Sequence, residues 1–569
     1  MIRSKRGVFW RFFHASRRVK IGLYFLLFAA QIIAYTSIFY YVYPILEKKP
    51  ISWPTSLLFV LETVTTIGYG ELLPFQNDLT ILITVVMMVT GVILIFMIIP
   101  LLLIPLLSSI FQRTPPSKPP HELSGHVIMV GFGELTKSLV ETLSVSSLPL
   151  LIVVNDPEIA MKAARETGAQ AYVIWGDYSE PGLWADAGIK HAYTVILSED
   201  ERTSAAIILG IREMFSGRII AVVDKLSLDR YLRYAGADYV LSAKHMTGKI
   251  LARHVALTSH IDTIVEETVS DRYPNELGPE AGTKLRIINL PIVRGSQAIG
   301  KTLRNLALFE KYGFDALLLS RGGHFRLYPS GDEVIDISTM LFLIGQVGRI
   351  EELVKNEFMP HEDQKEIAII GGFGDVGLSV YHELTNLGIE CIAIDQKKHD
   401  VSQVIGNTED EMTLREAHID EADVFIVALN DDDLNIFTTL IARDINPHIR
   451  ILARANEPES VTKLYRAGAD YVALLPSIGG QVIGGVVLSD FVHVILNLPN
   501  GQKVVRKRVM KSTSRTVGWI EDKSRVRIVG IEGADRSVVR PDPNEPVPEG
   551  DAVIAIGFPA DLQRLIGIL

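Results

Sequence analysis

The chain has 569 residues, of which 48% are hydrophobic and 21% are charged, and its formal net charge at pH 7 is −10. A chain of this length forms several domains, and its acidic balance argues against nucleic acid as a partner. The single cysteine, Cys391, excludes an intrachain disulfide framework.

The first 20 residues carry seven basic side chains and no acidic one, and aromatic residues are interleaved with them. This pattern predicts a basic amphipathic helix over residues 1–20 that lies at a membrane surface. The apolar run over residues 21–43 is too long for a signal peptide and long enough to cross a bilayer. The positive flank places the N-terminus in the cytoplasm.

Residues 53–64 are apolar but too few to cross the membrane and return, which indicates a re-entrant pore helix. The next segment, residues 65–71, contains Thr66, Ile67, Gly68, Tyr69 and Gly70. Alternating glycines allow successive carbonyl groups to point the same way, so that their oxygens can replace the water shell of a cation. The segment resembles the selectivity filter TVGYG of potassium channels, with Ile67 in place of Val. The resemblance implies K⁺ as the permeant ion and a homotetramer around the pore.

No charged residue occurs over residues 79–112, and the predicted inner helix over residues 79–111 would be about 50 Å long. This exceeds a hydrocarbon core of about 30 Å. Gly91, Pro100 and Pro105 are the predicted points of bending, since each proline removes a helical hydrogen bond. They indicate a gate or hinge, although glycine and proline are also simply common in membrane helices. The chain has no arginine-rich segment that could sense voltage.

A proline-rich linker over residues 113–123 precedes an internal repeat, in which Ala-Gly-Ala-Asp-Tyr-Val occurs at residues 235–240 and again at 467–472. Each copy alternates β-branched runs with helical periodicity, which indicates a parallel sheet wrapped by helices. We therefore predict two bilobed domains, residues 124–360 and 361–569. Each is expected to have a Rossmann-like α/β N-lobe and a small α+β C-lobe.

The soluble part resembles a tandem pair of RCK domains, the regulators of potassium conductance. The whole chain resembles prokaryotic two-transmembrane potassium channels gated by several ligands. The resemblance implies a homotetramer whose eight RCK domains form a cytoplasmic gating ring. It also implies an integral protein of a bacterial inner membrane, embedded in the lipid bilayer, with both termini in the cytoplasm. Apolar runs over residues 246–264 and 478–497 resemble the crossover helices that pair RCK domains; buried helices within one domain are the alternative.

The second repeat carries a glycine-rich turn between a strand and a helix, formed by Gly372, Gly374 and Gly377. Such a turn brings the pyrophosphate of a dinucleotide to the helix N-terminus, and Asp395, at the end of the next strand, suits ribose hydroxyl groups. A carboxylate there would repel a 2′-phosphate, which favours NAD over NADP; ADP or another adenine nucleotide is a further candidate. A Rossmann fold kept as scaffold with an empty cleft is the alternative. The family resemblance implies further contacts from Asn407, Asn430 and Arg454.

The first repeat departs from this pattern. Gly131 and Gly133 are present, but Thr136 replaces the third glycine and Asn155 replaces the ribose-binding carboxylate. We expect this cleft to bind a nucleotide fragment, to bind nucleotide more weakly, or to be empty.

Divalent cations are a second ligand class implied by the resemblance. Asp262, Glu266 and Glu267 form a carboxylate cluster near a predicted subunit contact, and oxygen ligands suit Ca²⁺. A solvated acidic helix face is the alternative.

The function predicted from these features is a ligand-gated potassium channel and not an enzyme. Two other classes stay open at this point, namely a membrane-anchored NAD-dependent oxidoreductase and a regulatory subunit of a separate potassium transporter. The sequence shows no general acid–base constellation and no second cofactor motif, which argues against the oxidoreductase. Its own filter would be redundant in a regulatory subunit.

Overall fold

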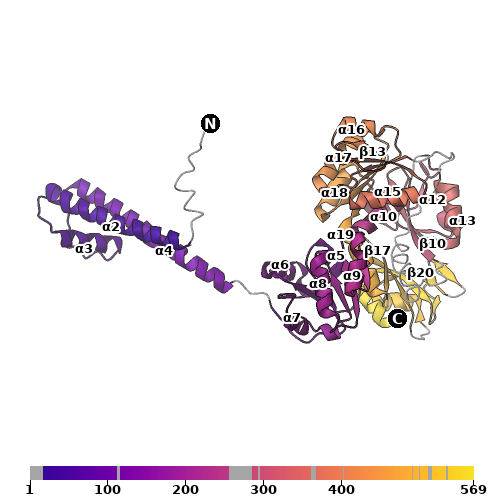
Figure 1. The fold of residues 1–569 in the computed structure, drawn as a ribbon, viewed down its shortest axis with the longest axis horizontal. Helices are drawn as coiled ribbons and strands as arrows, with labels where there is room; N and C mark the ends of the chain where they lie inside the picture. The colour runs from indigo at the N-terminus through magenta and orange to yellow at the C-terminus, as the bar shows by residue number, and fades with distance from the viewer. Residues whose placement is uncertain are drawn as a thin grey trace. The chain divides into compact units, whose positions relative to one another are not determined.

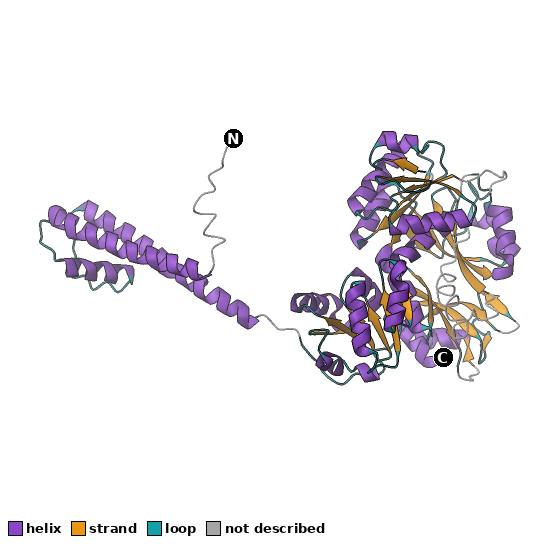
Figure 2. Ribbon diagram, in the orientation of Figure 1, coloured by secondary structure: helices purple, strands orange, loops and turns teal. Residues whose placement is uncertain are grey.

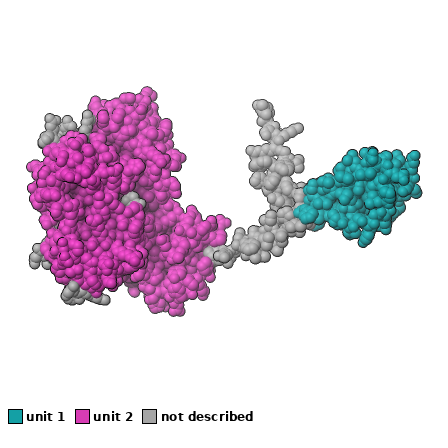
Figure 3. Space-filling view, turned by 180° about the vertical axis from the view of Figure 1, so that it is seen from behind, with its two compact units in different colours: residues 1–114 teal, residues 115–569 magenta. Residues whose placement is uncertain are grey.

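The computed structural model of the chain describes residues 17–111, 116–255, 285–292, 295–359, 367–401, 403–489, 491–498, 500–510, 515–533 and 536–569. The chain divides into two compact units, residues 1–114 and 115–569 (Figure 3). The first unit is helical, and the second combines helices and sheets (Figure 2). Residues 1–16 of the predicted amphipathic helix lie outside the described residues.

Three helices make up the described part of the first unit: α2 (Arg17–Glu47), α3 (Trp53–Val64) and α4 (Asp78–Phe111) (Figure 1). Two segments, Tyr24–Glu47 and Asp78–Phe96, are long and apolar enough to cross a membrane. Helix α3 starts where the Ser52 side chain accepts a hydrogen bond from the backbone of Thr55, with a proline in the first turn. The three helices share a core formed by Phe39, Tyr43, Phe59, Val60, Val64 and Met87.

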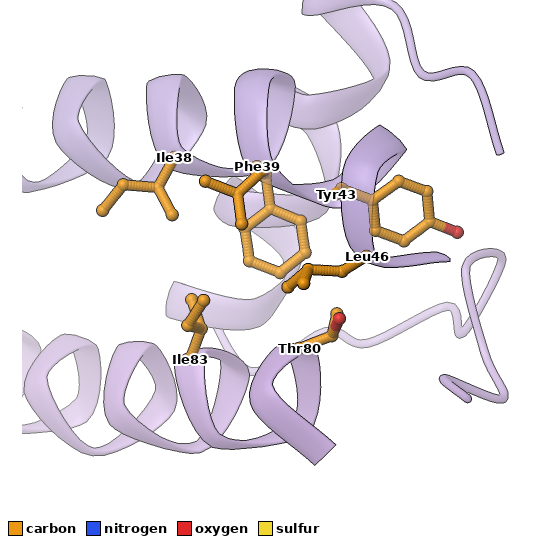
Figure 4. A pocket seen from close by; sticks show the side chains of 7 residues that line it. Ile38, Phe39, Tyr43, Leu46, Thr80 and Ile83 are labelled. Atoms are coloured by element: carbon orange, nitrogen blue, oxygen red, sulfur yellow. The ribbon is translucent and has the colours of Figure 1, made fainter. Parts of the chain in front are cut away.

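A small pocket of about 10 Å³ separates α2 from the start of α4. Figure 4 shows α2 side chains facing Thr80 and Ile83 of α4 across this gap, which has room for about one water molecule. At the end of α2, the Glu47 carboxylate accepts hydrogen bonds from the backbone N–H groups of Gln76 (2.9 Å) and Asn77 (3.0 Å). Since a carboxylate is favourable at a helix N-terminus, Glu47 fixes the end of the outer helix to the start of the inner one.

The second unit contains two Rossmann-like sheets of six parallel strands each, in the order β3-β2-β1-β4-β5-β6 and β13-β12-β11-β14-β15-β16. The first sheet consists of β1 (Val127–Val130), β2 (Leu150–Val154), β3 (Tyr172–Trp175), β4 (Thr194–Leu197), β5 (Arg218–Val222) and β6 (Tyr239–Leu241). The second consists of β11 (Ile367–Gly371), β12 (Glu390–Asp395), β13 (Gln403–Ile405), β14 (Val424–Val427), β15 (Arg450–Ala455) and β16 (Tyr471–Leu474). Most of these strands are buried runs of β-branched and aliphatic residues, as expected of strands covered on both faces.

Helices connect the strands of both sheets. The first domain has α5 (Glu134–Leu143), α6 (Pro157–Thr167), α7 (Pro181–Asp186), α8 (Glu201–Ile211) and α9 (Asp229–Ala235). The second has α15 (Asp375–Asn386), α16 (Glu411–Glu416), α17 (Asp432–Ile445) and α18 (Pro458–Ala467). Asp200 and Asp431 cap α8 and α17 through their side chains, because a carboxylate satisfies free N–H groups at a helix start.

Each Rossmann sheet is followed by a small antiparallel sheet. In the first C-lobe the order is β7-β10-β8-β9, and in the second it is β17-β18-β23-β20-β21. The first lobe comprises β7 (Leu285–Pro291), α12 (Leu303–Leu306), α13 (Leu308–Tyr312), β8 (Asp315–Arg321), β9 (His324–Leu327), β10 (Thr339–Gln346) and α14 (Ile350–Leu353). The second comprises β17 (His493–Asn497), β18 (Lys503–Arg508), β19 (Arg515–Thr516), α20 (Val517–Ser524), β20 (Arg527–Glu532), β21 (Ser537–Val539), β22 (Pro546–Val547), β23 (Ala552–Gly557) and α21 (Pro559–Ile568).

A reciprocal helix contact joins the two domains. Helix α10 (Ala243–Val255) of the first domain packs on α15 of the second, and α19 (Leu475–Leu488) packs on α5 of the first (Figure 1). A Cβ atom on Gly248 would lie 2.4 Å from the Cβ of Ser379, and one on Gly480 would lie 2.3 Å from the Oγ of Ser138. Glycine therefore permits the same close approach at both contacts.

The prediction of a second crossover helix over residues 478–497 is wrong at its end. Helix α19 stops at Leu488, and His493–Asn497 form strand β17. This strand pairs with β18, where Val494 lies opposite Val505 and both are buried. An apolar run of this length suits a buried strand as well as a helix. In the first domain, α10 ends at Val255 and the remaining residues of the predicted helix, 256–264, lie outside the described part of the chain.

Candidate functional sites

The predicted filter follows α3 as irregular backbone. Thr66, Gly68 and Gly70 have φ angles of 61°, 59° and 80°, so every second residue adopts a left-handed conformation. The backbone N–H groups of Ile67 and Gly68 donate to the carbonyl oxygen of Glu62, at 2.8 and 3.3 Å. This alternation is the geometry that allows successive carbonyl groups to face one side, and the hydrogen bonds fix the segment to the end of the pore helix.

Gly91 lies at a close contact between the inner helix and the pore helix. A Cβ atom there would lie 3.0 Å from Cγ2 and 3.2 Å from Cα of Val64, so the residue has a packing role independent of any bending. Pro100 and Pro105 lie within α4, which continues as one helix to Phe111.

The glycine-rich turn of the second domain is tightly built. Gly372 has a φ of 87°, and Gly374 is the N-cap residue of α15. A Cβ atom on Gly377 would lie 2.0 Å from the carbonyl oxygen of Gly372. Gly372 and Gly377 therefore require glycine, whereas a Cβ on Gly374 would meet open space, and the turn leaves the N-terminus of α15 open to a phosphate group.

Asp395 lies beside this turn at the end of β12. Its carboxylate accepts hydrogen bonds from the backbone N–H groups of Phe373 and Lys397, both at 2.8 Å. Burial alone would raise the pKa of Asp395, but these N–H groups and nearby His399 outweigh burial and hold the pKa below its ordinary value. The group is therefore a carboxylate at neutral pH, as a partner for ribose hydroxyl groups must be.

A pocket of about 180 Å³ opens at this edge of the second sheet. Asp395 and the predicted contact residue Asn407 both line it, and the Gln396 side chain donates to Asn407 Oδ1. The remaining lining residues come from the glycine turn and the neighbouring strand ends, and include Gly372, Ile394, Gly406, Thr408, Leu429 and Leu434. The pocket lies at the carboxyl ends of parallel strands, where open α/β sheets bind their ligands.

Arg454, near the end of β15, is a buried cation with neutral partners. Its side chain is 5% exposed and donates to Asn456 Oδ1 (2.6 and 3.0 Å) and to Asn430 Oδ1 (2.9 Å). Within the described chain no carboxylate forms an ion pair with it, although Asp432, Asp375 and Asp224 act on it from a distance. Burial lowers the pKa of Arg454, since removing a charge from water is unfavourable. Arg454 is thus a buried guanidinium near the end of β15 that bonds to amide oxygens and not directly to a carboxylate; the predicted contacts Arg454 and Asn430 are not among the residues that line the pocket.

A lysine from the other domain also reaches this cleft, which sequence reasoning missed. Lys244 of α10 lies with its Nζ 2.9 Å from Asp224 Oδ2 and 3.6 Å from Asp375 Oδ2, at the first residue of α15. No motif marks Lys244, because it is 131 positions before Asp375 in the sequence.

In the first domain, side chains that follow β4 lie close to the glycine turn. A Cβ atom on Gly131 would lie 2.9 Å from Ser198 Oγ and 3.0 Å from Glu199 Oε1. The Tyr178 hydroxyl donates to this carboxylate at 2.7 Å, and burial followed by the Glu199 charge raises the pKa of Tyr178 well above its ordinary value. An anionic side chain therefore lies against the turn where a phosphate would approach.

Other positions of the first cleft also disfavour a bound phosphate. Thr136 donates to the carbonyl oxygen of Gly131 at 3.2 Å, so this turn accommodates a side chain where the second turn has Gly377. Asn155 is exposed, and its neighbour Asp156 caps α6. Val222 takes the place of Arg454 in the repeat, and the cleft has no matching cation there.

The predicted calcium ligands Asp262, Glu266 and Glu267 lie outside the described residues. Among the residues that the structure does describe, no group of three or more His, Cys, Asp or Glu side chains is arranged to hold a metal ion.

These features define a membrane protein with a two-helix cation pore joined to paired Rossmann domains. Comparison with known families identifies an ion channel domain over residues 25–106 and TrkA-N domains over residues 127–243 and 368–475. Together these matches cover more than half of the chain. TrkA-N domains are the Rossmann lobes of RCK domains, and the chain belongs to the potassium channels that carry them.

Relatives support this assignment. The chain is 25% identical over 300 residues to potassium channel protein 1 of Methanocaldococcus jannaschii, a match that covers 50% of this chain and 80% of that protein. It is 29% identical over 245 residues to probable potassium channel protein 2 of the same organism, covering 38% and 71%. These relatives are channels and not enzymes, so we reject the oxidoreductase alternative.

Solved structures agree with the fold of the whole chain. The GsuK channel matches with a TM-score of 0.56 and 25% identity, and a structure titled GsuK channel bound to NAD matches with a TM-score of 0.55 and 26% identity. Each match covers 97% of this chain and 100% of the other. The chain is therefore a potassium channel whose two RCK domains follow a two-helix pore.

Proposed function

We propose that four copies of this chain surround one pore and that NAD, bound in the second Rossmann cleft, controls K⁺ conductance. In this assembly Thr66, Ile67, Gly68, Tyr69 and Gly70 form the filter, and eight RCK domains form a ring on the cytoplasmic side of the membrane. Ligand binding shifts the gate only if NAD has different affinities for the open and closed ring. Bending at Gly91, Pro100 and Pro105 would transmit the change to the inner helix.

The buried guanidinium of Arg454 is the observation that carries the proposal for the ligand. A buried cation bonded to amide oxygens is stabilised when an anion arrives, since charge-assisted bonds to phosphate are stronger than neutral ones. It lies near the end of β15, in the same parallel sheet as β12, whose last residue Asp395 lines the pocket with Asn407 and would supply a carboxylate for ribose. One cation, one carboxylate and a glycine turn match the pyrophosphate and ribose of a dinucleotide.

The proposal for other ligands and for the first cleft is more limited. ADP shares the adenosine and diphosphate of NAD and would use the same residues. For the first cleft we propose weak or no nucleotide binding, because Glu199 would repel a phosphate near Gly131 and Gly133, and Asn155 offers no carboxylate. Calcium binding by Asp262, Glu266 and Glu267 stays a prediction.

Single-channel recording in planar bilayers under a K⁺ gradient tests the proposal, with NAD added to the side of the RCK domains. We expect a K⁺-selective conductance whose open probability changes with NAD, and whose response in Asp395→Ala no longer occurs at the NAD concentrations that act on the wild-type chain. Gly68→Asp should abolish the conductance and leave NAD binding intact, because the pore and cleft lie in different units. A selective conductance that ignores NAD would refute the ligand part of the proposal and keep the pore.

A further inference from the structure

Lys244 gives the second cleft a charged group from the first domain, and the inference drawn from it rests on the proposed binding of NAD. Lys244 is the second residue of α10, and its side chain is 23% exposed. It forms an ion pair with Asp224 of its own domain and reaches Asp375 of the other domain. The neighbouring residue, His245, contacts Ser379 Oγ through Nδ1 at 2.7 Å, so α10 is fixed against α15 at this end.

Asp375 creates the need for a cation at this position. It is the first residue of α15, directly after the N-cap Gly374, and its side chain is 42% exposed. Its carboxylate interacts well with the helix dipole, but it also places a negative charge beside the N–H groups that would receive a phosphate. The ammonium group of Lys244, paired with Asp224 and near Asp375, can neutralise this charge and, on its flexible stem, bind the arriving phosphate.

The first cleft lacks this arrangement, although the two domains are related by the repeat. At the offset of 232 residues that relates the repeated motifs, Pro476 takes the place of Lys244. Glu134 takes the place of Asp375, and its partner is Lys137 of the same helix at 2.5 Å, which also contacts Glu166 at 2.6 Å. A cation that crosses the domain boundary is thus a feature of the second cleft.

We propose that Lys244 is a phosphate-binding residue of the second cleft, contributed by the first domain. The complete nucleotide site then spans both RCK domains of one chain and forms only while α10 is packed on α15. NAD would therefore bind the docked pair of domains more tightly than a separated pair. Nucleotide bound in the second domain would contact α10 of the first domain through Lys244.

Isothermal titration calorimetry of NAD into the purified full-length chain in detergent tests this inference. We expect Lys244→Met to weaken NAD binding about tenfold, the scale of one lost charge-assisted bond. Lys244→Arg should stay within about threefold, and Lys249→Met, which removes an equal charge from the same helix, should change affinity by less than about twofold. Unchanged thermal unfolding without NAD would show that the Lys244→Met chain is folded.

An Asp375→Asn background separates phosphate binding from simple neutralisation. If Lys244 binds the phosphate, Lys244→Met still weakens NAD binding severalfold when Asp375 is already neutral. Loss of that effect would overturn the phosphate-binding role, as would equal NAD affinity in the Lys244→Met and wild-type chains. If the wild-type chain binds no NAD, the proposed function fails and the inference falls with it. If it binds NAD and depends on Asp395 but not on Lys244, the inference alone is wrong.

Discussion

The two Rossmann domains share strand order, helix positions and a Gly-Phe-Gly turn, yet different charged side chains surround the two turns. In the second, Leu429 lies against Gly372, and the nearby charges include the buried cation Arg454. In the first, the Glu199 carboxylate lies against Gly131. The second cleft therefore combines the cations Arg454 and Lys244 with nearby carboxylates, whereas at the first turn the charge in contact is the carboxylate of Glu199.

The shared fold therefore does not decide whether a cleft binds a nucleotide. The glycine turn provides close approach in both domains, but the charge of the side chains around it sets the sign of the electrostatic contribution. The proposed preference of NAD for the second cleft over the first would follow from a few substitutions at equivalent positions. The predictions below change those positions one at a time.

The largest effect is expected when the second turn is given the residue of the first. In Gly377→Thr the new Cβ would lie 2.0 Å from the carbonyl oxygen of Gly372, so the turn must widen. Overpacking that costs about 3 kcal/mol corresponds to a loss of NAD affinity on the order of a hundredfold. Calorimetry measures the loss of NAD affinity. Thr136→Gly in the first turn serves as the control, with an expected change below about twofold. Wild-type affinity in Gly377→Thr would contradict the tight-turn argument.

Removing the buried cation should have the next largest effect. Arg454→Leu gives the second cleft an aliphatic residue like Val222 of the first, and NAD affinity should fall about 10- to 100-fold, since bonds to charged groups contribute about 1.5–3 kcal/mol. Arg415→Leu removes an exposed arginine of the same domain, 49% exposed in its ion pairs, and should leave affinity unchanged. Equal losses in the two variants would mean that overall charge and not the buried site is responsible.

The ribose contact should contribute less. Asp395→Ala is expected to weaken NAD binding about tenfold, because a carboxylate that accepts from ribose hydroxyl groups makes charge-assisted hydrogen bonds. The matched change in the first domain, Asn155→Ala, should have no measurable effect. Equilibrium dialysis with labelled NAD can compare them at equal protein concentration, and a loss of affinity in Asn155→Ala would show that the first cleft is occupied.

The smallest effect is expected from neutralising the first cleft. Glu199→Gln removes the negative charge beside Gly131 but supplies no cation at Val222, so the chain should still bind one NAD with unchanged affinity. The stoichiometry from calorimetry checks this. Two NAD molecules per Glu199→Gln chain would show that Glu199 alone keeps the first cleft closed.

The features that depend on local sequence patterns can be predicted from the sequence. The filter segment and the glycine turn are each formed by residues close together in the sequence, and Asp395 follows the turn at the end of the next strand, so spacing predicts them. The Rossmann sheets follow from the alternation of β-branched runs and amphipathic helices, and the solved GsuK structures share this fold over 97% of the chain.

Features that depend on distant segments were not accessible in this way. Glu199 and Lys244 reach the clefts from other elements, and neither has a spacing that marks it. The role of Gly91 as a contact to Val64 also requires the packing of α4 on α3. Strand β17 was assigned to a helix because a short apolar run does not reveal its partner, and only pairing with β18 decides its conformation.

The reciprocal contact of α10 on α15 and α19 on α5 has a consequence for how such channels diversify. In an assembly of identical single-domain subunits, a lysine at the position of Lys244 would appear at every cleft or at none, because one gene encodes all of them. Covalent fusion of the two halves removes that constraint. Pro476 can then occupy, in one half of the chain, the position that Lys244 occupies in the other. One half could therefore lose its ligand, while Gly248 and Gly480 preserve the helix contact between the two halves.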